Sequence, residues 1–165
     1  TPLTKDDMLR HLLILACLAQ PAAAQAADSL LLEAPDSRLV LQAADWAPLP
    51  RDTMRVQFHD QAPLTYSGVP LPALLQLIGI RADSLRGKSL SLRVIVEASD
   101  GYRVVLSLAD LDPTLGGRRV LLADRADGQP LPATEAPFRL LIDGDQRPSR
   151  WARQIVAVRV RAEGP

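Results

Sequence analysis

The feature that most restricts the fold of this 165-residue chain is a succession of short apolar runs separated by turn-forming residues. Most runs alternate apolar and polar residues over about the length of one strand, which is typical of a sheet with one face on a core. Asp100-Gly101, between two such runs, predicts a tight hairpin. The expected strands are 29–34, 38–43, 53–60, 89–99, 101–108, the first part of 118–132, 137–145 and 152–161.

Only 68–80 has a sustained helical period. Prolines stand in its first turn and Gly79 ends the pattern. Four of its apolar residues are spaced to share one helix face: Leu71, Leu74, Leu75 and Ile78. Shorter helical turns are expected at 43–50 and at 107–113, where Ser107 is a suitable N-cap. Because no βα unit repeats, the sequence predicts a sheet-rich α+β domain and not a doubly wound sheet.

The first 26 residues predict export. Met8 to His11 form a short basic segment, 12–19 is apolar, and Ala24-Gln25-Ala26 is typical of a signal-peptidase site. An apolar segment of this length is too short to span a bilayer, so we expect no transmembrane segment in the mature chain. The expected division is therefore 1–26, upstream residues with a cleaved signal peptide, and 27–165, a single periplasmic domain.

Removal of the signal peptide limits the chemistry of the mature domain. Cys17 is the only cysteine of the chain and lies in that segment, and His59 is then the only histidine left. A zinc site of His and Cys ligands and a Cys-His nucleophile pair are both excluded. No G-x-S-x-G motif is present to position a serine nucleophile. We therefore single out no catalytic residue and no metal ligand.

The charge of the whole chain gives little indication of a partner. The formal net charge is zero, so no overall field favours nucleic acid or an anionic membrane. One stretch is locally basic, because "DGDQRPSRWARQ" (143–154) places Arg147, Arg150 and Arg153 around Trp151. It is either a solvated turn whose own acidic residues neutralise the arginines, or a site for an anion.

Several segments, taken together, resemble a known family. They are "TYSGVPLPALLQLIGI" (65–80), "SDGYRVVLSLADLDP" (99–113), "VLLADRADGQPLP" (120–132), "APFRLLIDGD" (136–145) and "RPSRW" (147–151). Their order and spacing over roughly 54–161 resemble the molybdopterin-binding domain of the sulfite oxidase family of oxidoreductases. The resemblance implies a sheet-rich fold with short helices, and molybdopterin, an anionic pterin with a phosphate tail, as cofactor.

The resemblance also implies a set of cofactor-binding residues. Arg147 falls on the arginine, Arg150 on the lysine and Trp151 on the tryptophan of the family's basic R-x-x-K-W segment. Arg139 falls on the arginine of its P-x-R-L strand, and Tyr102 on the tyrosine of its aspartate-glycine-tyrosine strand. Guanidinium groups held near one another can bind a phosphate through charge-assisted hydrogen bonds.

Three departures from the family pattern bear on function. The family binds molybdenum through a cysteine thiolate, and the corresponding slot here is about Phe58, His59 or Asp60. His59, a candidate cofactor-binding residue, and Asp60 are either a ligand or proton-handling pair in place of the cysteine, or a polar strand end that meets a loop. The loop that follows this slot in the family is almost deleted. A histidine before the P-x-R-L strand is replaced at Thr134 or Glu135. Because the loss of a thiolate removes a metal ligand outright, ordinary sulfite-oxidase catalysis is not expected.

Two functions follow as alternatives. The first is an exported oxidoreductase-like domain that still binds a molybdopterin-like or other anionic cofactor, with a partner chain completing the site. The second is a cofactor-free periplasmic binding or sensing module that uses an arginine-lined cleft for a small anion or an envelope protein. The sequence favours neither the presence nor the absence of a cofactor. A purely structural partner in an envelope complex is a third alternative.

Overall fold

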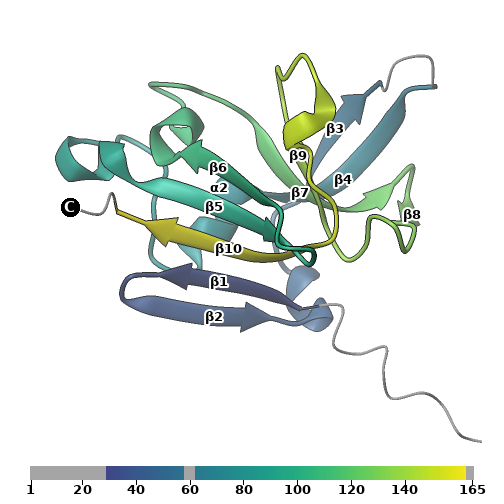
Figure 1. Cartoon of the computed structure of the whole chain (residues 1–165), viewed down its shortest axis with the longest axis horizontal. Helices are drawn as coiled ribbons and strands as arrows, with labels where there is room; N and C mark the ends of the chain where they lie inside the picture. Colours follow the sequence, from purple (N-terminus) through teal and green to yellow (C-terminus); the bar gives the residue numbers. More distant parts are fainter. Residues whose placement is uncertain (1–28, 58–61, 163–165) are drawn as a thin grey trace, which may run out of the picture.

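The computed structural model describes residues 29–57 and 62–162, in which ten strands form two sheets (Figure 1). Sheet A consists, in spatial order, of β2 (Ser37–Leu41), β1 (Leu30–Ala34), β10 (Ile155–Arg161), β5 (Arg93–Ala98) and β6 (Arg103–Ser107). Sheet B consists of β3 (Asp52–Val56), β4 (Leu64–Pro70), β7 (Val120–Ala126) and β8 (Gln129–Pro130), with β9 (Arg139–Ile142) also paired to β7. Neighbouring strands are antiparallel except β1 and β10, which are parallel.

The helices are short. The described residues contain one α-helix, α2 (Leu71–Gln76), which lies behind sheet A in Figure 1. Four 3-10 turns complete the fold: η1 (Ala43–Trp46), η2 (Gly87–Ser91), η3 (Leu108–Leu111) and η4 (Pro148–Arg150). The prediction of a sheet-rich domain with short helices is therefore confirmed. Within the described residues, no helix is both long enough and apolar enough to cross a membrane.

The alternation of apolar residues accounts for the core. One face of sheet A is turned to the core, where Leu30, Leu32, Val94, Val96, Val158 and Val160 are fully buried. These side chains pack with α2 and with one face of sheet B in the larger of two apolar clusters. The other face of sheet B carries the second cluster, which includes Met54, Tyr66, Leu121 and Leu141. Burial on both faces explains why β9 reads as a continuous apolar run.

The predicted helix over 68–80 begins later than expected. Residues 64–70 form β4, which sequence analysis did not predict, and the helix starts at Leu71. Gly68 lies at a register shift where β4 passes very close to β7, and a Cβ atom there would lie 2.1 Å from the Leu122 carbonyl oxygen. The predicted apolar face is confirmed, because Leu71, Leu74, Leu75 and Ile78 are all buried.

Two further boundaries differ. The run predicted as a strand over 89–99 becomes strand only at Arg93, because residues 87–91 form η2. The predicted strand over 53–60 is β3 as far as Val56, and its end, with His59, lies outside the described residues. The expected signal peptide also lies outside them. Turns at 43–46 and 108–111 confirm the short helices, and Ser107 caps the second through the Ala109 N–H.

Asp112 joins the segment after η3 to the segment before η2. Its wholly buried carboxylate accepts hydrogen bonds from the Leu85 N–H at 2.7 Å, the Thr114 N–H at 2.8 Å and the Thr114 hydroxyl at 2.7 Å. These bonds, the Leu85 bond first, hold the pKa of the Asp112 carboxyl below its ordinary value. The ionised form of Asp112 is thus part of the folded structure.

Candidate functional site

A cavity of about 570 Å³ brings together three of the residues predicted to bind a cofactor: Tyr102, Arg139 and Trp151. They come from the β5–β6 hairpin, the first position of β9 and the segment after η4. The remaining lining residues are Ala98, Asp100, Thr134, Pro148, Ser149, Ala152, Arg153 and Gln154. We call this space the Tyr102 cavity.

Hydrogen bonds fix the aromatic walls of the Tyr102 cavity. The Tyr102 hydroxyl donates to the Ser149 carbonyl oxygen at 2.9 Å, which ties the hairpin to η4. The Trp151 indole N–H donates to the Ile142 carbonyl oxygen at 3.1 Å, and its ring packs against both apolar clusters. These two contacts set the shape of the cavity without a ligand, which is the preorganisation that a binding site needs.

Arg139 is neutralised from within the protein. Its Nη1 donates to the Glu135 carboxylate and, at 3.0 Å, to the Tyr66 hydroxyl, and its guanidinium lies 5.3 Å from the centre of the Tyr66 ring. The Arg139 and Glu135 side chains are only 9% and 17% exposed. Burial raises the pKa of the Tyr66 hydroxyl, so that it stays a neutral member of this group. Glu135 therefore supplies the negative charge that the resemblance assigns to a cofactor.

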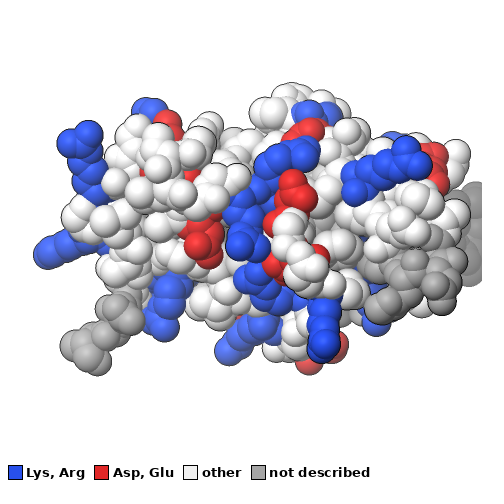
Figure 2. Space-filling model, turned by 90° about the horizontal axis from the view of Figure 1, so that it is seen from above, with Lys and Arg blue, Asp and Glu red and all other residues white. Residues whose placement is uncertain are grey.

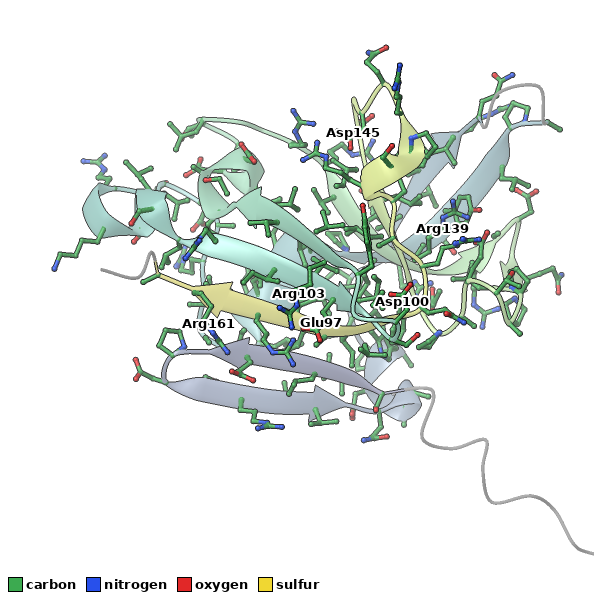
Figure 3. The ribbon with its side chains drawn as sticks, in the orientation of Figure 1. Glu97, Asp100, Arg103, Arg139, Asp145 and Arg161 are labelled. Atoms are coloured by element: carbon green, nitrogen blue, oxygen red, sulfur yellow. The ribbon has the colours of Figure 1, made fainter. Side chains whose placement is uncertain are left out.

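Arg150, predicted to bind the same ligand, does not line the Tyr102 cavity. Its Nε donates to Asp145 at 2.9 Å and its Nη2 donates to the same carboxylate, which also accepts Arg118 Nη1 at 3.0 Å. The hydrogen bond to Asp145 raises the pKa of Arg150. Figure 3 shows Asp145 in the upper loop, apart from Asp100 and Arg139.

Arg147 is exposed and also lies outside the cavity lining. The basic stretch 143–154 is therefore divided: Trp151 and Arg153 face the cavity, whereas Arg150 is held by Asp145 at the surface. Figure 2, which views the molecule from the side on which η4 lies, shows arginine and acidic side chains interleaved across the middle of that face. Neutralisation by an acidic residue of the same stretch is thus confirmed for Arg150, and an anion site in the part that lines the cavity stays a prediction.

Three residues of the cavity were missed as site residues. Arg153 is exposed and makes no ion pair within the described part of the chain. Asp100 accepts the Tyr102 N–H at 2.9 Å in the hairpin turn. Gln154 has a positive φ of 54° and donates to the Ala133 carbonyl oxygen at 3.2 Å, which connects β10 to the loop before β9. The Asp100-Gly101 turn was recognised in the sequence, but nothing local indicated that its aspartate lines the same cavity as Trp151.

The donor set does not fit a thiolate-bound molybdenum centre. The one cysteine of the chain, Cys17, precedes the described residues and lies in the expected signal peptide. Over residues 29–57 and 62–162, no three His, Cys, Asp or Glu side chains are grouped as metal ligands. The two arginines expected to hold the pterin phosphate, Arg150 and Arg147, are respectively paired with Asp145 and outside the cavity. We derive no chemical step through molybdopterin.

No protein-family model matches the chain, and no curated protein shows significant sequence similarity to it. The resemblance to the sulfite oxidase family stays a prediction that rests on the quoted segments.

Proposed function

We propose that this chain is an exported binding domain that takes a small organic anion in the Tyr102 cavity and does not carry out sulfite-oxidase chemistry. The proposal keeps the sulfite-oxidase-like architecture expected from the sequence and assigns it a binding or sensing role in the periplasm. The observation that carries it is the convergence of Tyr102, Trp151 and Arg153 on one cavity of about 570 Å³.

Size and lining support a small-molecule site. Cavities of roughly 300–1,000 Å³ are typical of ligand sites, which combine apolar walls with a few polar groups that orient the ligand. Here the two aromatic rings supply the walls, and Thr134, Ser149 and Gln154 supply neutral polar groups.

The lining has one arginine and one carboxylate that form no ion pair in the described residues, Arg153 and Asp100, which favours a ligand with both an anionic group and a hydrogen-bond donor. Arg139 and Glu135 cancel each other, and Arg150 is paired with Asp145. Arg153 remains as a cation in the cavity lining without an ion-pair partner among the described residues, so it is the group with donors to offer. Asp100, on the same lining, accepts hydrogen bonds and would favour a ligand that also carries a donor. A heterocyclic acid with ring N–H groups has both properties.

A carboxylated pterin and inorganic phosphate are suitable probes. Binding is followed through tryptophan fluorescence, because Trp151 is in the cavity wall. We expect the pterin to bind and Arg153→Gln to weaken it about tenfold, since a hydrogen bond to a charged group contributes roughly 1.5–3 kcal/mol and exposure reduces that value. Arg125→Gln is the matched control, because Arg125 is an exposed arginine of β7 outside the cavity. The proposal is contradicted if the chain binds neither probe, or if Arg153→Gln and Arg125→Gln lose equal affinity for the pterin.

A molybdopterin-type cofactor is the second candidate, favoured by two aromatic rings that line one cavity together with an arginine. The chain is purified from cells that make the molybdenum cofactor, and molybdenum and pterin are assayed. Stoichiometric molybdenum would overturn the cofactor-free proposal, whereas pterin-free protein that binds added carboxylated pterin supports it.

A further inference from the structure

The outer face of sheet A carries a grid of charged residues that no function discussed so far uses. Cross-strand pairing fixes which residues share this face: Arg38, Glu33, Arg159 and Ile95 lie in one row, and Ala157, Glu97 and Arg103 lie in the next. Arg161 and Arg93 form a third row. Figure 3 shows Glu97 and Arg103 side by side over sheet A, with Arg161 farther along β10.

The face has an excess of positive charge. Five arginines stand against two glutamates, which leaves three positive charges uncompensated, although the whole chain is neutral. Glu97 pairs with Arg103 at 3.3 Å and with Arg159, and Glu33 pairs with Arg161 and, at 3.7 Å, with Arg159. Both carboxylates therefore already form ion pairs with other arginines of this face. Arg38 and Arg93 are exposed and make no ion pair in the described residues.

The shape of this face fits an extended partner and not a small ligand. None of the charged residues on it lines any of the cavities found in the described residues. Aliphatic side chains are exposed at its two borders, where Val40 of β2 is 46% and Val105 of β6 is 52% exposed. The five strands present no aromatic side chain outward. Protein interfaces usually centre on aromatic anchors in pockets, so this face lacks what a protein partner would need.

We propose that the outer face of sheet A docks on an anionic phospholipid surface. The excess arginines would contact lipid phosphates, and Val40 and Val105 would approach the boundary between headgroups and acyl chains. A fluid array of phosphates matches a spread positive charge without requiring shape complementarity. This proposal does not depend on a ligand in the Tyr102 cavity, because the two surfaces share no residue.

Vesicle co-sedimentation with the full chain tests the proposal. The measured quantity is the ratio of partitioning onto mixed phosphatidylcholine–phosphatidylglycerol vesicles to partitioning onto phosphatidylcholine vesicles. Each excess charge near an anionic surface contributes roughly fivefold, so three predict a ratio of about 100 at low salt. Arg38→Glu/Arg93→Glu turns the face from three positive to one negative and should bring the ratio near or below one.

The control is Arg125→Glu/Arg147→Glu, which changes the net charge of the chain equally at two exposed arginines outside sheet A. The apolar run 12–19 is common to all three proteins, so only differences between them report on the face. We expect the control to keep most of the ratio, provided that circular dichroism shows all three folded. Equal losses in both variants, or no loss, would overturn the proposal.

Two further experiments distinguish a lipid surface from a free small anion and from an acidic protein. Free glycerol phosphate at the same phosphate concentration should not displace the chain from vesicles, and displacement would indicate a small-anion site instead. Binding to immobilised polyglutamate without any preference for phosphatidylglycerol would overturn the lipid assignment in favour of an acidic protein.

Discussion

Replacing Asp145 with asparagine should separate the structural role of the basic loop from its capacity to bind anions. The Asp145 side chain is 8% exposed and accepts Arg150 on both oxygens and Arg118 on one. Asparagine keeps the size but loses the charge and one acceptor. Hydrogen bonds to charged groups contribute about 1.5–3 kcal/mol each when well buried. Because Arg118 and Arg150 are 36% and 40% exposed, hydrogen bonds to water replace part of this contribution. We therefore expect Asp145→Asn to lower the free energy of unfolding by about 2 kcal/mol.

Urea denaturation followed by circular dichroism measures this change, and Asp143→Asn is its control. Asp143 is two residues away in the same loop, but its side chain is 54% exposed and lies 3.7 Å from Arg119. Its replacement should cost less than about 0.5 kcal/mol. The same experiment with added phosphate gives a second readout. The two arginines that Asp145 holds become available in Asp145→Asn, so phosphate should stabilise that variant more than the unchanged chain.

Equal and small losses in both variants would show that Asp145 does not hold the loop. A loss in Asp145→Asn that phosphate leaves unchanged would refute the idea that the carboxylate occupies the place of an anion. Either result would return Arg150 to the status of a solvated surface residue.

Three further changes test other parts of the structure. Tyr102→Phe removes the tie to Ser149 and should lower the unfolding free energy by about 1 kcal/mol and weaken pterin binding, measured by urea denaturation and fluorescence titration. Asp112→Asn should destabilise the chain at neutral pH. Since the folded pKa of Asp112 is lowered, the difference from the unchanged chain should shrink as pH falls through and below 3.8, in denaturation series at several pH values. Gly68→Ala should lower the free energy of unfolding by more than about 3 kcal/mol, because backbone atoms occupy the Cβ position. Gly101→Ala, at a φ of +84° with open space around it, should lower it by only about 1 kcal/mol. Thermal melts compare the two variants, and similar losses would contradict the close approach of β4 to β7.

The sequence predicted elements wherever one local pattern decided the outcome. Alternation placed β1, β2, β5 and β6 within a few residues, and the helical spacing of Leu71 to Ile78 identified the buried face of α2. The start of that helix was wrong because tertiary pairing overrode the pattern. Gly68 and Val69 belong to β4 because they pair with β7. No local property of "GVPLP" predicts pairing with residues about fifty positions later in the chain.

The sequence predicted three members of the candidate site, but not its other members or the partners of its charged residues. Tyr102, Arg139 and Trp151 do meet in one cavity, which their separation along the chain could not establish without the resemblance. Arg150 and Arg153, three residues apart, end in different environments, because η4 ends at Arg150 and the chain leaves the helical conformation at Trp151. Which arginine meets which carboxylate depends on loops brought together by the fold, and Arg118 with Asp145 is a pair of that kind.

The internal pairing of the arginines bears on whether this fold needs a ligand. A domain that used an anionic cofactor to neutralise its buried arginine would lose several kcal/mol when empty, because an uncompensated buried charge is costly. Here Glu135 balances Arg139, and Asp145 forms ion pairs with both Arg150 and Arg118, without any ligand. The folded state should therefore be stable alone, and a ligand should add only the stabilisation that mass action allows for a contact at Arg153. A protein that unfolds on removal of a bound anion would show that these carboxylates are insufficient, and would favour the cofactor-dependent alternative.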